Sequence, residues 1–257
     1  ILPQVSRTFK IPMFNSQIAD FYSKVTQQTV NYRKTNNVTR SDFLQLFMQL
    51  HDDGQGLTMN QVTANAFLFV IAGYETTAAT ISHCLFEISR NEEIQSRVQE
   101  EIDEVLGGEF NYEKVNDLKY LESCVTETLR KYPVVPILNR VCKHDYQLKG
   151  TSYVIPAGTS IIIPIFGMQR DPEVFDDPMT FNPTRSSSNS LIAPFGLGQR
   201  ACVGARMATF VIKLTISSLL AKYNLQLVHP VTSELTFSPK VVSLTPNEKI
   251  LIKFTHR

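Results

Sequence analysis

The pattern of hydrophobic and polar residues along the chain changes once, near Pro136. Before it, apolar residues recur at the spacing of an α-helix, and after it short runs rich in Val and Ile stand between turn residues. The pattern therefore predicts a mainly α protein with a small β region, an α+β fold in which the helices come first.

The first part of the chain is expected to hold one helix of unusual length. Residues 1–40 are mixed and polar and predict only short helices, and residues 41–53 place their apolar side chains on one helical face. The stretch Thr58–Arg90 has no proline and predicts a single helix. Its middle, residues 66–80, is apolar almost all round, so we expect it to run through the protein interior.

Two further helices precede the change in pattern. Asn91 is a good N-cap for a helix that ends at Gly107 and Gly108. Another is predicted over Tyr112–Tyr132, because Pro133 ends it.

The second part is expected to be irregular around a short β region. Residues 137–165 predict strands, and residues 166–201 predict a long, proline-rich loop of the kind that usually has a function. A helix is predicted from Cys202 to about Lys222, followed by strands near 225–228 and 248–254.

Composition excludes several classes of protein. A formal net charge of +1 gives no general attraction to nucleic acid. The longest clean apolar run, Ala66–Gly73, is far shorter than the roughly 20 residues of a membrane-spanning helix. The chain begins with Ile1 and has no signal-peptide pattern, which suggests that upstream sequence is missing.

Four cysteines are present, and one of them has an unusual setting. No CxxC pair occurs, so zinc-ribbon and thioredoxin-like sites have no support. Cys84, Cys124 and Cys142 are interpreted as inert, buried thiols. Cys202 stands where a loop turns into a helix, and the N–H groups and dipole of the first helical turn favour a thiolate there.

The residues around Cys202 indicate a flat, anionic ligand. In the segment PFGLGQRACVG, Gly196, Gly198 and Gly204 allow the backbone to approach closely, Phe195 offers an aromatic face, and Arg200 can bind an anion. A thiolate among such residues suits a haem with its propionates.

This segment resembles the haem-binding signature of cytochromes P450, F-x-x-G-x-R-x-C-x-G, at Phe195, Gly198, Arg200, Cys202 and Gly204. The resemblance implies a haem b cofactor, with Cys202 as the axial thiolate ligand of the iron and the other four residues in cofactor binding. It also implies that the chain is the C-terminal portion of the cytochrome P450 fold.

A second resemblance lies in the long helix. Ala72-Gly73-Tyr74-Glu75-Thr76-Thr77 is similar to the family's A-G-x-[DE]-T-[TS] segment. An acid beside a hydroxyl in an apolar helix is costly without a purpose. The resemblance implies that Thr76 and Glu75 are catalytic, passing protons to bound oxygen, and that Ala72 contacts the cofactor. In isolation, Thr76 would be interpreted as a hydroxyl that bonds back along its own helix.

A third resemblance is the family's E-x-x-R pair, Glu127 and Arg130, with Arg185 supplied by a downstream P-x-R stretch. The spacing puts the pair on one helical face, and a carboxylate between two guanidiniums forms a rigid clamp. The implied role is structural, to lock the loop that carries Cys202. A fourth resemblance is the segment Asn139-Arg140-Val141-Cys142 after this helix, which implies that Arg140 pairs with a haem propionate.

Together the matches resemble an animal microsomal enzyme, closest to insect detoxification enzymes, over the chain from about residue 40. Residues 1–257 would then be a partial domain that lacks the N-terminal half and its membrane anchor, and the loop between Arg185 and Phe195 looks short. The implied enzyme lies on the cytosolic face of the endoplasmic reticulum membrane. It would act on small lipophilic substrates with O2 and electrons from NADPH-cytochrome P450 reductase, with cytochrome b5 as a second candidate partner.

The reductase is expected to dock on the Cys202 side, where Arg200, Arg206 and Lys213 would contribute positive charge.

Three alternative functions stay open at this point. The first is a haem-thiolate isomerase, which needs no proton-delivering alcohol such as Thr76. The second is an inactive fragment or interaction module, and the third is a helical domain without haem.

Overall fold

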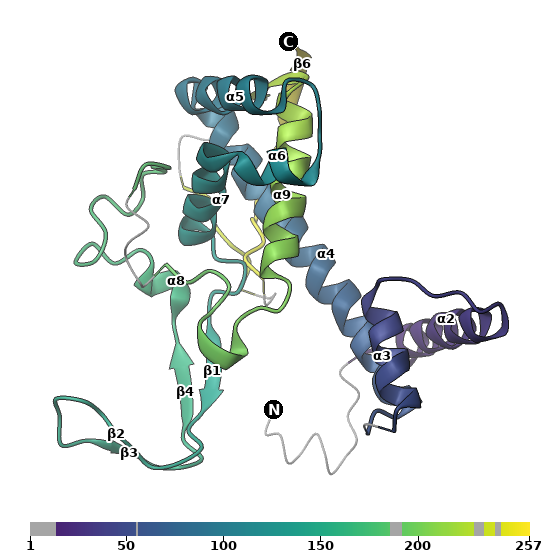
Figure 1. The fold of residues 1–257 in the computed structure, drawn as a ribbon. Helices are drawn as coiled ribbons and strands as arrows, with labels where there is room; N and C mark the ends of the chain where they lie inside the picture. Colours follow the sequence, from purple (N-terminus) through teal and green to yellow (C-terminus); the bar gives the residue numbers. More distant parts are fainter. Residues whose placement is uncertain (1–13, 55, 186–191, 229–233, 240–242) are drawn as a thin grey trace. The chain divides into compact units, whose positions relative to one another are not determined.

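The computed structural model describes residues 14–54, 56–185, 192–228, 234–239 and 243–257, and it falls into two compact units, Ile1–Tyr74 and Glu75–Arg257. The described helices are α2 (Ser16–Thr35), α3 (Phe43–Asp52), α4 (Met59–Arg90), α5 (Glu92–Leu106), α6 (Tyr112–Asp117), α7 (Lys119–Lys131), α8 (Ile165–Met168), the 3-10 turn η1 (Gly198–Arg200) and α9 (Ala205–Leu220) (Figure 1). The strands are β1 (Leu138–Val141), β2 (Tyr146–Gln147), β3 (Val154–Ile155), β4 (Ser160–Ile163), β5 (Tyr223–Leu227) and β6 (Ile252–His256). The prediction of a mainly α protein with a small β region is confirmed.

The first unit contains a helix that the sequence did not predict. Where only short helices were expected, α2 runs for 20 residues, so that prediction was wrong. Its buried face consists of Thr26, Val30 and Arg33, and only one of these is apolar, which hides the helical period. Arg33 donates two hydrogen bonds, of 2.8 and 2.6 Å, to the carboxylate of Asp42, the N-cap of α3. This pairing joins α2 to α3.

Helix α4 has the predicted length, 32 residues, but not the predicted burial. In the apolar stretch 66–80, Leu68, Val70 and Tyr74 are 57%, 49% and 77% exposed, so the expectation of an interior segment was wrong. Within this stretch only Thr80 is buried, because the partners of α4 in the buried cluster of the second unit pack against the end of the helix.

The helix predicted over Tyr112–Tyr132 is two helices, α6 and α7, separated at Leu118. The cause is a carboxylate from α5. Glu101 Oε1 and Oε2 accept the backbone N–H groups of Tyr120 and Leu121 at 2.7 and 2.9 Å, which caps a new helix start. A contact between residues about 20 positions apart gives no local signal, so the sequence pattern did not reveal the break.

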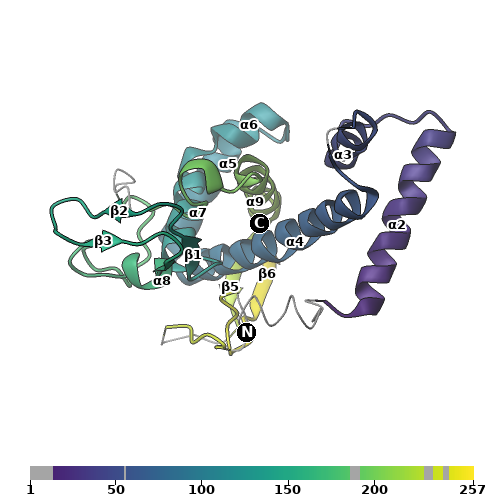
Figure 2. The same cartoon turned by 90° about the horizontal axis from the view of Figure 1, so that it is seen from below.

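The core of the second unit gathers around the end of α4. Apolar side chains of α4, α5, α6, α7, α9 and β5 form one buried cluster, and Figure 2 shows α5, α7 and α9 beside this part of α4. Among the described residues the sheets are two-stranded and antiparallel, pairing β1 with β4, β2 with β3 and β5 with β6. Side-chain amides of α5 add to the core, since Gln95 exchanges two hydrogen bonds with the backbone of Leu225. Helix α9 is thereby held by several neighbours, and the loop that precedes it carries Cys202.

Candidate functional site

The loop before α9 presents the thiol of Cys202 to solvent. Gly196 and Gly198 have φ angles of +73° and +71°, a left-handed conformation that side chains other than glycine rarely adopt. This conformation lets the chain turn back, and the backbone N–H of Cys202 donates to the carbonyl of Phe195 at 2.7 Å. Cys202 is exposed, whereas the ring of Phe195 packs against the core cluster. The loop therefore fixes the backbone of Cys202 and leaves its sulfur accessible.

Helix α9 starts three residues later than predicted, at Ala205, with Gly204 as its N-cap. A Cβ atom built on Gly204 would lie 3.9 Å from the Sγ of Cys202. The sulfur therefore lies beside the first turn of the helix, where the dipole favours a negative charge.

Two predicted cofactor-binding arginines lie open to an anion. Arg200 is exposed at the end of η1, and Arg140 lies on β1, where its Nη1 donates to the carbonyl of Asn139. Within the described stretches neither forms an ion pair. Both keep guanidinium donors for a carboxylate or phosphate ligand.

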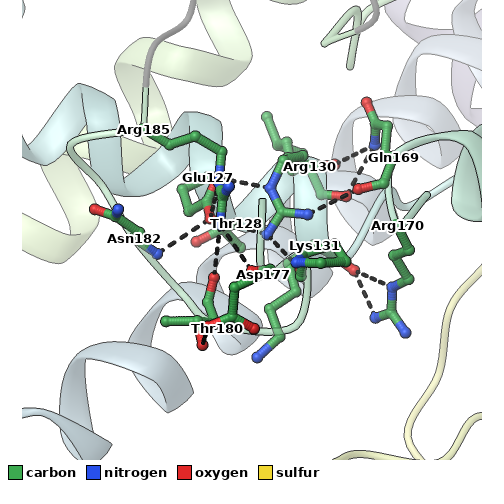
Figure 3. Close-up of polar contacts among 12 residues, drawn as sticks. Glu127, Thr128, Arg130, Lys131, Gln169, Arg170, Asp177, Thr180, Asn182 and Arg185 are labelled. Carbon is green, nitrogen blue, oxygen red and sulfur yellow. Dashed lines mark hydrogen bonds and ion pairs between the residues drawn. The ribbon is translucent and has the colours of Figure 1, made fainter. Parts of the chain in front are cut away.

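The predicted clamp residues come together in the interior (Figure 3). Arg130, which is fully buried, donates to both carboxylate oxygens of Glu127 at 2.7 and 2.9 Å. Arg185 Nε lies 3.3 Å from Glu127 Oε1, and the backbone N–H of Asn182 donates to the same oxygen at 3.1 Å. One carboxylate thus binds two guanidiniums and the backbone of the downstream segment.

The two guanidiniums also bind backbone carbonyls of the long loop. Arg130 donates to Gln169 O and Pro178 O, and Arg185 donates to the carbonyls of Asp177 and Thr180 at 3.0 and 3.3 Å. The loop that follows α8 is therefore fastened to α7. Residues 186–191, which make up most of the connection judged short in the sequence, lie outside the described residues.

A buried glutamine completes the clamp and was not predicted. The side-chain Nε2 of Gln169 donates to the carbonyls of Leu129 and Arg130 at 3.2 and 2.9 Å. These carbonyls belong to the last turn of α7, where no intrahelical donor remains. Gln169 lies outside the motifs matched around Cys202, Glu75 and Glu127, so the sequence analysis gave it no role.

The two predicted catalytic residues lie on α4 and differ in exposure. Glu75 is exposed, and its Oε1 accepts a hydrogen bond from the hydroxyl of Ser243. Thr76 is half-buried, and its carbonyl accepts the hydroxyl of Thr80 at 2.9 Å. Ala72 is exposed on the same helix. The partner that the structure gives Glu75 is thus a serine near the C-terminus, which the sequence analysis missed because the two residues are 168 positions apart.

One residue expected on the docking surface is buried. Lys213 is 1% exposed, and its Nζ donates to the carbonyl of Asn116 at 2.8 Å and to Glu122 at 3.0 Å. Its charge is already paired inside the second unit, so the prediction that it contributes to a partner surface was wrong. Arg200 and Arg206 are exposed, as that prediction requires.

The other three cysteines differ in burial. Burial raises the pKa of Cys84 to about 12 and raises that of Cys124 further, so both thiols stay protonated and the prediction of inert, buried thiols is confirmed for them. Cys142 is only half-buried, because it follows β1 at the edge of a two-stranded sheet, and its thiol lies 3.0 Å from the carbonyl of His144. Cys202 is the exposed one of the four.

Comparison with known proteins decides the family, because the model of the family described as Cytochrome P450 matches residues 2–254. The chain belongs to the cytochrome P450 family. This match begins well before residue 40, where the resemblance in the sequence was first apparent. No helix in the described parts of this P450 chain has both the length and the hydrophobicity to span a membrane.

Several similar curated proteins come from insects. The chain is 32% identical to "Probable cytochrome P450 6d5" of Drosophila melanogaster over 282 residues, which cover 99% of the chain and 55% of the relative. It is 36% identical to "Cytochrome P450 6d1" of Musca domestica over 235 residues, which cover 79% of the chain and 46% of the relative. The predicted similarity to insect P450 enzymes is confirmed. The chain spans about half the length of the curated relatives it matches.

The described residues fit a haem in the chemistry of their donors. Membership of the P450 family implies an iron held by a cofactor that brings most of its own ligands. Haem does so and requires one axial side chain, for which the exposed thiol of Cys202 is suited. Arg200 and Arg140 offer donors for the propionates.

Proposed function

We propose that the protein is a haem-thiolate monooxygenase that inserts one oxygen atom of O2 into small lipophilic substrates. The observation that carries the proposal is the exposed Cys202 thiol beside the start of α9, on a loop that matches the P450 signature. Similarity over the whole chain to enzymes named as cytochromes P450 supports it.

In this proposal each residue of the loop has a task in holding haem b. Cys202 is the axial ligand of the iron, Gly198 and Gly204 let the porphyrin approach, and Phe195 stabilises the loop from the core side. Arg200 and Arg140 pair with the propionates. When bound, haem supplies the oxygen chemistry, which an electron-rich thiolate ligand promotes.

The proton-handling residues are proposed to be Thr76 and Glu75. A hydroxyl and a carboxylate on neighbouring positions of α4 can accept and release protons beside the cofactor. The proposed role of Glu127, Arg130 and Arg185 is to hold the segment after α8, and through it the Cys202 loop. Their buried hydrogen bonds support that role.

Electrons are proposed to come from NADPH-cytochrome P450 reductase, with cytochrome b5 as a second donor, at the endoplasmic reticulum membrane. The support is a surface beside Cys202 with both cationic and apolar groups. Arg200 and Arg206 are exposed there, and Val203 and Met207 are 78% and 67% exposed. Arg206, Val203 and Met207 line a shallow pocket with Tyr112 and Phe210. Oxidation of foreign compounds is the proposed task, in keeping with the similarity to insect enzymes.

Turnover by the haem-loaded protein with reductase tests the function. We expect oxidation of a lipophilic alkoxy-coumarin that needs both NADPH and O2. Thr76→Ala is expected to lower product formation about 100-fold, because proton transfer from a positioned group contributes about that much. Thr77→Ala is the control on the same helix and should stay near the parent rate. Isomerisation of organic peroxides without NADPH, with no NADPH-dependent product, would establish the isomerase instead.

A further inference from the structure

The carboxylate of Glu75 accepts a hydrogen bond from a residue outside the family motifs that the sequence analysis matched. The hydroxyl of Ser243 donates to Glu75 Oε1, and both residues belong to the second unit. We propose that Ser243 is a positioning residue for Glu75, which keeps the carboxylate in the orientation from which it handles protons. The inference rests on the proposed function, in which Glu75 takes part in proton delivery.

Helix α4 itself cannot hold this carboxylate. The side chains beside Glu75 on the helix surface are those three and four positions away, and all of them are apolar: Ile71, Ala72, Ala78 and Ala79. Thr76 is the next residue, and successive residues of a helix point about 100° apart, so its hydroxyl does not face the carboxylate. A fixed orientation of the Glu75 carboxylate therefore requires a hydrogen-bond donor from another part of the chain. The hydroxyl of Ser243 is that donor.

The backbone that carries Ser243 is anchored. The N–H of Leu244 donates to the carbonyl of Val134, just after α7, at 3.2 Å, and Ser238 N–H donates to Thr245 O at 2.9 Å. Phe237 pairs with Pro246 as an isolated β-bridge. Nearby, Leu235 is buried in a cluster with Phe86 and Tyr132, against which Phe237 packs. The hydroxyl that meets Glu75 thus stands on a segment tied to the core of the second unit.

Anchoring matters because Glu75 is exposed. An exposed glutamate samples many rotamers, and a proton donor or acceptor is effective only where its distance and direction to the reacting group are set. A hydrogen bond to an ionised carboxylate is stronger than one between neutral groups, so a single hydroxyl can select one orientation. Thr245 Oγ1 lies 3.4 Å from Ser243 Oγ and adds a second hydroxyl next to the first.

The test uses Ser243→Ala in the haem-loaded protein with reductase. We expect the share of NADPH electrons released as hydrogen peroxide to rise about threefold or more, because protons arrive less reliably from an unpositioned carboxylate. The solvent deuterium isotope effect on product formation should rise with it, while the spectrum of the carbon-monoxide complex stays unchanged. Ser243→Thr restores the hydroxyl and should restore both values.

Two comparisons separate positioning from general loosening of the segment. Thr236→Ala removes a hydroxyl of the same segment that binds Glu248 and Asn247 rather than Glu75, and it should leave the peroxide share at the parent value. In a Glu75→Gln background, Ser243→Ala should change nothing further, since Ser243 acts through Glu75. The proposal would be overturned if Ser243→Ala raised the peroxide share equally in the parent and in the Glu75→Gln background. It would also be overturned if Thr236→Ala raised the peroxide share as much as Ser243→Ala, or if Ser243→Ala had no effect.

A measurement without haem keeps this result separate from the proposed function. The side-chain carboxylate 13C signal of Glu75, assigned by its loss in Glu75→Gln, should move in Ser243→Ala and stay in place in Thr236→Ala. A parent protein without turnover would refute the proposed function, and with it the role in catalysis. An unmoved signal in Ser243→Ala would refute the contact itself.

Discussion

Replacing Glu127 by alanine is expected to lower the free energy of unfolding by about 3–5 kcal/mol, as removal of one partner from a buried ion pair generally does. Arg130 is fully buried and would keep its charge without the carboxylate that binds two of its nitrogens. Arg185 and the N–H of Asn182 would lose the same acceptor. Urea unfolding followed by circular dichroism measures the loss.

The matched control is Glu104→Ala, which removes an exposed glutamate from α5 and should change the free energy of unfolding by no more than about 0.5 kcal/mol. Arg185→Ala should cost less than Glu127→Ala, because Arg130 keeps its partner. If Glu127→Ala costs no more than the control, the clamp contributes nothing to the stability of the fold.

Lowering the pH is expected to reduce the free energy of unfolding by about 3 kcal/mol through the protonation of His83. This magnitude corresponds to the difference between the pKa of His83 in the unfolded and the folded chain. The ring is 1% exposed and stacks on Tyr132 with the ring centres 4.8 Å apart. Burial lowers its pKa from 6.5 to about 4, an effect that the backbone of Ala79 partly opposes. Within the described residues neither ring nitrogen makes a hydrogen bond of good geometry.

The direction follows from the proton count. Below pH 6.5 His83 is protonated in the unfolded chain, whereas in the folded chain it becomes protonated only near pH 4. The free energy of unfolding is therefore highest above pH 6.5 and falls as the pH is lowered from 6.5 to about 4. His83→Phe keeps an aromatic ring against Tyr132 and should remove this part of the slope. His144→Phe, at an exposed position, should leave it unchanged. Parallel stability curves for the parent and His83→Phe between pH 7 and pH 4 would contradict this account.

Local signals predicted the elements and motifs that depend on neighbouring residues. The length of α4 follows from an unbroken helical period, and the caps Asn91 and Gly107 around α5 are the expected residue types. The proximity of Glu127 and Arg130 follows from helical spacing. The approach of Arg185 to the same carboxylate came only from the family resemblance, since 58 positions separate them.

The features that the sequence did not predict depend on contacts between distant residues. Glu101 divides α6 from α7 through two backbone N–H groups that any sequence would provide. Lys213 looked like a surface charge, but α6 and α7 supply acceptors that allow its burial. Ser243 is one of many serines, and only the fold brings it to Glu75. Hydrophobicity predicted burial for residues 66–80, whereas burial also requires a packing partner.

The central claim, that Cys202 is the thiolate ligand of a haem iron, is tested most directly by the absorption spectrum of the reduced, carbon-monoxide-bound protein expressed with haem supplied. We predict a thiolate-type Soret band that is retained in Cys142→Ser and lost in Cys202→Ser. A band that persists in Cys202→Ser would contradict the claim. So would the absence of the band from the protein expressed from its full natural coding sequence.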